Sequence, residues 1–163
     1  MPTDDLNSNP ENARRGAAKL HRRLSGQHEC SLDEKGRLSI PVEFRTILGL
    51  TEGSELRVTR HIKLPCVVIY RPDAFDALLD QAERSGTREG RVLIRVIGGT
   101  ARTMVLDKAG RISIPNIFRE PVGLAGPAFV VGMDQHLELW APESWDATHG
   151  PEVHGDLDFT DWM

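Results

Sequence analysis

The chain of 163 residues lacks the features that mark a membrane or secreted protein. No apolar run approaches the roughly 18 to 20 residues that cross a bilayer. The N-terminus also has no apolar stretch of the signal-peptide type. We therefore expect a soluble, cytoplasmic protein that has no membrane partner.

Cysteine is scarce, and its spacing argues against the usual cysteine chemistry. Only Cys30 and Cys66 are present, both in strand-like runs and without CxxC spacing. We expect two buried free thiols rather than a disulfide framework or a zinc site. The six histidines are scattered, with none of the i, i+4 pairs typical of a metal site. The sequence therefore predicts no metal and no other cofactor.

The fingerprints of common enzymes are missing as well. The chain has no nucleophile elbow, P-loop or dinucleotide motif, and Gly98-Gly99 alone carries no information about phosphate. One route to catalysis stays open, since two aspartates from related halves of a protein can meet at a pseudo-dyad. Nothing else in the sequence favours an enzyme, and we predict none.

What the sequence does contain is an internal repeat. Residues 33–45, DEKGRLSIPVEFR, return 74 residues later as DKAGRISIPNIFR at 107–119, with eight of thirteen positions identical. Chance does not readily restore Asp, Gly, Arg, Ser, Ile, Pro, Phe and Arg in one order. The chain is therefore built from a duplicated unit.

Each copy predicts a strand, a tight turn and a second strand. In the first copy Asp33 can start the turn by accepting backbone N–H groups, and Gly36 supplies a position where φ can be positive. Leu38 and Ile40 then fall on one face of the second strand, opposite to Arg37. The arginine is therefore expected to face away from the core.

A short helix is predicted after the second strand. Pro41 suits the first helical position, Phe44 and Leu48 lie on one apolar stripe, and Gly49 suits a left-handed cap. In the second copy Pro121 implies a shorter or bent last turn.

Further strands are predicted at 56–59 and 66–70 in the first copy and at 129–131 and 136–140 in the second. Each pair leads to a proline that can begin a helix. One unit of this size is marginal alone, so we expect the halves to share apolar surface. The expected organisation is an arm at 1–23, a first unit at 24–76, a linker helix region at 77–99, a second unit at 100–146 and a tail at 147–163.

Charge is segregated along the chain, although the net charge is only −4. Residues up to Arg119 carry 20 Lys and Arg against 15 Asp and Glu, whereas nine acids and no Lys or Arg follow. We expect a mobile basic arm at 1–23 and an acidic tail from 147 that is disordered when unbound. Trp162 in this tail has no role that the sequence explains.

The paired Asp-x-x-Gly-Arg-(Leu/Ile)-Ser-Ile-Pro units, followed by VGM at 131–133 and LELW at 137–140, resemble the MraZ family over about residues 24–145. The resemblance implies an α+β fold of two pseudo-symmetric swapped-hairpin units of the AbrB type, with short helices. It also implies a ring-forming, nucleoid-associated bacterial DNA-binding regulator, acting at promoters of the division and cell-wall gene cluster. The chain departs from the family in its N-terminal extension and its longer polar tail.

By the same match the family's signature arginine falls on Arg37 and Arg111. We predict that both contact DNA, because an arginine at a strand start beside a glycine can present its fork to phosphate or to guanine edges. Lys35 and Lys108 are further candidates for DNA contact.

The paired acids of the two units are Asp33 and Asp107. We predict that they are structural turn acids that hold the arginines in internal ion pairs, since a carboxylate facing DNA would repel phosphate. Arg45 and Arg119 are expected to be solvent-facing helix charges or interface partners rather than DNA contacts.

A single domain presents few such cations, so useful affinity requires that the site be multiplied by symmetry. The predicted partners are therefore double-stranded promoter DNA with repeated elements, and other copies of the chain in a homo-oligomeric ring. An alternative is a protein-binding scaffold or antitoxin-like module that uses the same fold without promoter readout.

Overall fold

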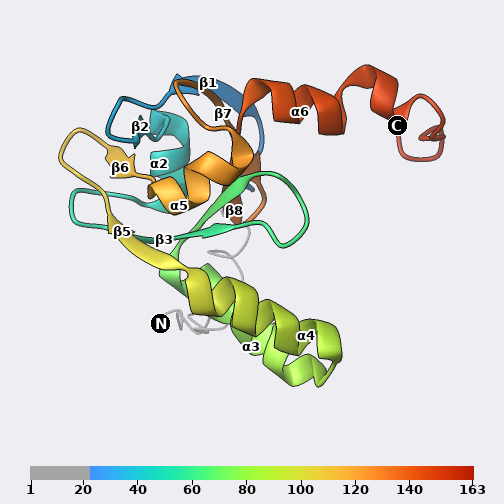
Figure 1. The fold of residues 1–163 in the computed structure, drawn as a ribbon, viewed down its shortest axis with the longest axis horizontal. Helices are drawn as coiled ribbons and strands as arrows, with labels where there is room; N and C mark the ends of the chain where they lie inside the picture. Colours follow the sequence, from blue (N-terminus) through green and yellow to red (C-terminus); the bar gives the residue numbers. More distant parts are fainter. Residues whose placement is uncertain (1–22) are drawn as a thin grey trace, which may run out of the picture.

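The computed structural model describes residues 23–163, so the predicted arm lies outside the described residues except for Arg23. The described chain has a six-stranded antiparallel sheet, a separate two-stranded sheet and short helices packed around them (Figure 1). This mixture confirms the predicted α+β class.

The elements follow the predicted order in both copies. The first half contains β1 (Gln27–Ser31), β2 (Arg37–Ser39), α2 (Val42–Leu48), β3 (Glu55–Arg60) and β4 (Val67–Tyr70). The connection consists of α3 (Pro72–Ser85), α4 (Arg88–Leu93) and the π-helical turn η1 (Ile94–Gly98). The second half contains β5 (Arg102–Val105), β6 (Arg111–Ser113), α5 (Asn116–Arg119), the 3-10 turn η2 (Glu120–Val122), β7 (Pro127–Met133) and β8 (His136–Trp140). The helix α6 (Pro142–His149) and the 3-10 turn η3 (Pro151–His154) follow.

Strands from the two halves alternate in a way that interlocks them. The large sheet has the order β1-β7-β8-β4-β3-β5, so β1 of the first half pairs with β7 of the second, and β5 of the second pairs with β3 of the first. The small sheet joins β2 to β6. Each half therefore completes the sheet of the other, which is the exchange that a swapped hairpin describes.

The core lies where the two copies meet. Leu38 and Ile40 of the first copy and Ile112 and Ile114 of the second are all buried in one apolar cluster. The burial of these side chains confirms that the inward faces of β2 and β6 are apolar. Burying both faces together removes from water the apolar surface that one half alone would expose.

The predicted helix ends are present in both copies. Pro41 and Pro115 are the N-cap residues, one position before the helix rather than its first residue. Gly49 and Gly123 close the helices in the left-handed conformation, with φ of 64° and 68°. In the second copy the helix shortens to four residues and continues as the 3-10 turn that contains Pro121. Of the shorter or bent last turn predicted from this proline, the shorter helix is confirmed.

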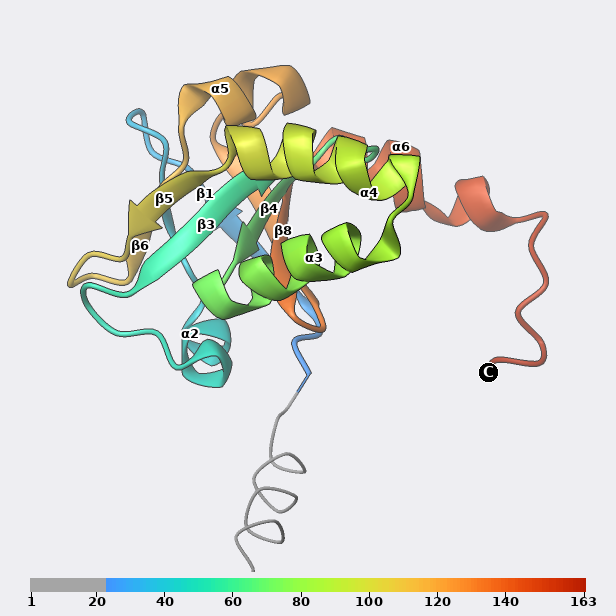
Figure 2. The same ribbon diagram turned by 90° about the horizontal axis from the view of Figure 1, so that it is seen from below.

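The connection between the halves is a helical hairpin of α3 and α4, whose turn points away from β6 (Figure 2). Gly90 of α4 packs so closely on α3 that an added Cβ would lie 2.3 Å from the carbonyl oxygen of Ala82.

The expectation of a tail without regular structure from residue 147 is wrong for its first part. α6 continues through His149, because this ring packs against Trp145 and Trp140, with centroid distances of 4.6 and 5.0 Å. One 3-10 turn follows at Pro151–His154. Beyond His154 the described chain has turns but no helix or strand.

The two thiols differ in their surroundings. Cys66 is buried, as predicted, whereas Cys30 is only half-buried because β1 is an edge strand that pairs with β7 alone. No helix within residues 23–163 is long and apolar enough to span a bilayer.

Candidate nucleic-acid interface

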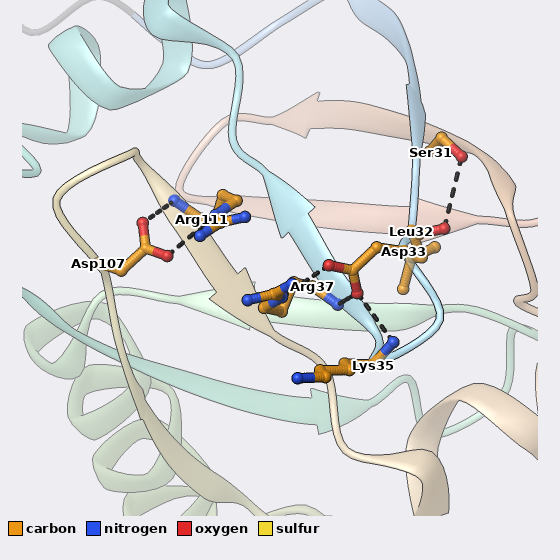
Figure 3. Close-up of polar contacts among 7 residues, drawn as sticks. All are labelled: Ser31, Leu32, Asp33, Lys35, Arg37, Asp107 and Arg111. Carbon is orange, nitrogen blue, oxygen red and sulfur yellow. Dashed lines mark hydrogen bonds and ion pairs between the residues drawn. The ribbon is translucent and has the colours of Figure 1, made fainter.

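The first repeated turn is held by the carboxylate of Asp33 (Figure 3). Its Oδ1 accepts the backbone N–H groups of Lys35 and Arg37, each at 2.9 Å, and its Oδ2 accepts Nε of Arg37 at 2.6 Å. The carbonyl oxygen of Asp33 accepts the N–H of Gly36, whose φ of 75° is the left-handed value that glycine adopts without strain. One carboxylate thus fixes both the turn and its arginine.

The second turn repeats these contacts. Asp107 accepts the backbone N–H groups of Ala109 (2.8 Å) and Arg111 (2.9 Å), and also Nε of Arg111 (3.0 Å). In each turn the hydrogen bond from the arginine backbone is the main cause that lowers the pKa of the aspartate. Both aspartates are therefore ionised at neutral pH and fix their arginines as charged partners.

The pairing of β2 with β6 brings the two arginines together. Arg37 lies opposite Ser113, and Ser39 lies opposite Arg111, while the residues between them point into the core. Because side chains alternate along a strand, these four residues share the outward face. We call this surface, made of Arg37, Ser39, Arg111 and Ser113, the twin-arginine face.

The guanidinium groups on this face keep hydrogen-bonding capacity. The side chains of Arg37 and Arg111 are 36% and 38% exposed, and each uses Nε for its aspartate. Within residues 23–163 their Nη atoms donate no hydrogen bond. Each arginine is therefore oriented by its carboxylate while up to four N–H groups point away from it.

The lysines around the turns do not follow the pseudo-symmetry. Lys35 and Lys108 are both exposed, but Lys35 corresponds to Ala109 and Lys108 corresponds to Glu34. Each turn thus contributes one lysine at a different position. Because each aspartate offsets the charge of its own arginine, these lysines matter for the positive potential around the face.

Arg45 and Arg119 have a role that sequence reasoning missed. Nε of Arg45 donates to the carbonyl oxygen of Ile40 at 3.0 Å, and Nε of Arg119 donates to that of Ile114 at 2.8 Å. These arginines are neither free helix charges nor contacts on the twin-arginine face. The sequence feature that could have indicated this role is the presence of an arginine at the same position in both copies of the repeat.

Each of these arginines also packs on the turn of the other copy. The guanidinium of Arg119 lies against Gly36 and that of Arg45 lies against Gly110, so closely that a Cβ at either glycine would come within 2.6 Å of it. The glycine carbonyls also accept backbone N–H groups from the other copy. The carbonyl of Gly36 accepts that of Ile114 at 2.8 Å, and the carbonyl of Gly110 accepts that of Ile40 at 3.0 Å. The two Asp-Arg turns are therefore positioned by each other's helices.

A buried carboxylate lies apart from this surface, on β8. Glu138 accepts Nε1 of Trp140 at 2.8 Å and lies 3.5 Å from Nε2 of His136. Burial raises the pKa of Glu138, but the hydrogen bonds from His136 and Trp140 outweigh it, so the pKa is lowered. Its contacts are those of a satisfied structural group. Within the described part of the chain no cluster of three or more His, Cys, Asp or Glu side chains could hold a metal ion.

The described chain is thus an α+β protein of two interlocked repeats, whose paired turns present two oriented arginines on one face. A family model described as "MraZ protein, putative antitoxin-like" matches residues 24–94 and 97–149. With that match covering most of the sequence, the chain belongs to the MraZ family.

Curated relatives agree with this assignment. The chain is 36% identical over 122 residues to the transcriptional regulator MraZ of Roseiflexus sp. (strain RS-1), covering 74% of this chain and 82% of the relative. It is 36% identical over 125 residues to that of Dechloromonas aromatica (75% and 83%), and 30% identical over 130 residues to that of Hydrogenovibrio crunogenus (78% and 85%). The family is one of transcriptional regulators, not of enzymes.

Proposed function

We propose that the protein is a sequence-specific DNA-binding transcription regulator whose twin-arginine face contacts double-stranded DNA. The observation that carries the proposal is the presentation of Arg37 and Arg111 on one face, each with Nε bound to its aspartate and with Nη atoms that donate no hydrogen bond to residues 23–163. A guanidinium fork matches phosphate oxygens or the O6 and N7 edge of guanine. The major groove of B-DNA admits a two-stranded β-ribbon, and β2 with β6 is such a ribbon.

The proposal includes assembly into a homo-oligomeric ring. Among the described residues, the two turns of one copy offer two arginines and two lysines, and the paired aspartates offset part of their charge. Binding of one copy is therefore weak and sensitive to salt, whereas several copies on repeated promoter elements raise the apparent affinity. This function is supported by the relatives, which are named transcriptional regulators. The family resemblance favours the division and cell-wall gene cluster as the target. The protein would then act in the cytoplasm, at the nucleoid.

Substitution of the arginines tests the proposal. We expect Arg37→Ala, and likewise Arg111→Ala, to weaken binding to the protein's own upstream DNA more than tenfold, since losing a base or phosphate contact costs about 1–3 kcal/mol. Footprinting and a salt series of binding isotherms measure the change. Arg37→Lys keeps the charge but loses the fork, so its binding should lie between those of the wild type and the alanine variant.

Arg84→Ala is the matched control, because Arg84 is an exposed arginine in the last turn of α3, next to the hairpin turn that points away from β6. It should leave promoter binding within twofold of the wild type. Equal losses for Arg37→Ala and Arg84→Ala would show that only general charge matters. A wild-type protein that fails to bind DNA even at low salt would favour the protein-binding scaffold instead.

A further inference from the structure

The end of the chain alternates acidic and large apolar residues. Residues 156–163, DLDFTDWM, which we call the tail peptide, lie beyond the last residue of the family match, 149. Leu157, Phe159 and Trp162 are 55%, 50% and 85% exposed. A tail that served only to keep the protein soluble would need its acidic residues but not these apolar ones. Several exposed apolar side chains in one short segment are typical of a segment that packs on a partner.

A pocket with complementary chemistry lies on the helical hairpin. A cavity of about 310 Å³ is formed between α4 and the loop that joins β3 to β4, and we call it the α4 pocket. Its apolar wall is made by Ile62, Val92 and Leu93, and its charged residues are Lys63, Arg88 and Glu89. Ile62 and Val92 are 37% and 46% exposed. The lining of the pocket therefore combines solvent-exposed apolar surface with more positive than negative charge.

Further positive charge surrounds the α4 pocket. Arg91 and Arg95 follow on the same helical segment and are exposed. Glu89 and Glu83 are the acids on this part of the hairpin. A ligand that combines an apolar side chain with carboxylates fits both parts of this surface, since the apolar group fills the cavity and the carboxylates meet the arginines.

We propose that the tail peptide of one copy docks in the α4 pocket of a second copy. Trp162, the most exposed of the three apolar side chains, fills the apolar cavity, and the neighbouring aspartates face Lys63 and Arg88. A second copy is the occupant because α6 and η3 lead the tail away from the sheet of its own chain in both views (Figures 1 and 2), where the tail side chains stay exposed. The contact is separate from the twin-arginine face and does not depend on DNA binding.

Cross-linking of full-length chains tests this contact. One variant carries Val92→Cys in the pocket and the other carries Thr160→Cys in the tail peptide. Both also carry Cys30→Ser, so that Cys66, which is buried, is the one native cysteine that remains. The two proteins are mixed and treated with a short bis-maleimide, and a size tag on one of them identifies mixed dimers. We expect mixed dimers at least fivefold above the yield of either variant alone. Adding Trp162→Ala to the tail variant, or Arg88→Glu to the pocket variant, should reduce that yield at least fivefold.

Two controls separate this contact from others. Lys108→Cys replaces Val92→Cys in one mixture, and it places the thiol beside the twin-arginine face. A yield there equal to that of Val92→Cys would show that the acidic tail lies on the other basic surface and would overturn the proposal. The chain carrying both Val92→Cys and Thr160→Cys should form covalent multimers, whereas a product closed only within one chain would also refute docking between copies.

Discussion

Replacing Gly36 by alanine tests whether the two repeats hold each other's turns. The added methyl group would lie 2.5 Å from Nε of Arg119 and 2.8 Å from the carbonyl oxygen of Ile114. The left-handed backbone at φ 75° costs about 1–2 kcal/mol for a residue with a Cβ. Moving Arg119 away loses its hydrogen bond to Ile114, and a bond from a charged donor contributes about 1.5–3 kcal/mol. The expected loss in the free energy of unfolding is therefore about 2.5–5 kcal/mol.

Denaturation of Gly36→Ala and Gly53→Ala by urea separates the two contributions. Gly53 has a similar φ of 84°, but a Cβ there would meet nothing within 4 Å. Its alanine variant should lose only the backbone contribution of about 1–2 kcal/mol. The double variant Gly36→Ala with Arg119→Ala should be more stable than the sum of the two single losses predicts, because both remove the same contact.

Two results would refute this reasoning. If Gly36→Ala and Gly53→Ala lose the same free energy, the contact with Arg119 contributes nothing. If the losses of Gly36→Ala and Arg119→Ala simply add, the turn and the helix of the other copy are not coupled.

Three further predictions concern other parts of the chain. Glu138→Ala should destabilise the fold by about 1–3 kcal/mol in urea because it leaves the buried indole N–H of Trp140 without its acceptor, and Glu138→Gln should recover part of the loss. The pKa values of Asp33 and Asp107 are lowered in the folded state, so their stabilisation is complete above the unfolded value near 3.8 and is lost as the pH falls through the folded value. The Asp33→Asn/Asp107→Asn variant should therefore lose less melting temperature than the wild type between pH 5 and pH 3, and parallel curves would argue against this role. Deleting residues 1–23, with five cations, should keep base preference and reduce the salt slope of DNA binding, and an unchanged slope would place the arm away from DNA.

The local features of the turns could be predicted from the sequence because their contacts join near neighbours. Asp33 meets Lys35 and Arg37, two and four residues away, so the residue types alone indicate the turn and its ion pair. Alternation likewise predicted that Leu38 points inward, because the period of a strand is two. The glycine that ends α2 was predicted for the same reason, since a left-handed cap depends on one residue.

Only the tertiary structure decided how the copies meet. The pairing of β2 with β6 joins residues 72 to 76 positions apart, and no local pattern specifies such a register, yet it alone brings Arg37 and Arg111 onto one face. The packing of Arg119 on Gly36 is likewise invisible in a pattern read along the chain, because it depends on a helix of one copy reaching the turn of the other. The extent of α6 was misjudged for a related reason. A polar segment becomes helical there because His149 packs on Trp140 of β8, which the fold places beside it, and on Trp145 one turn earlier in the same helix.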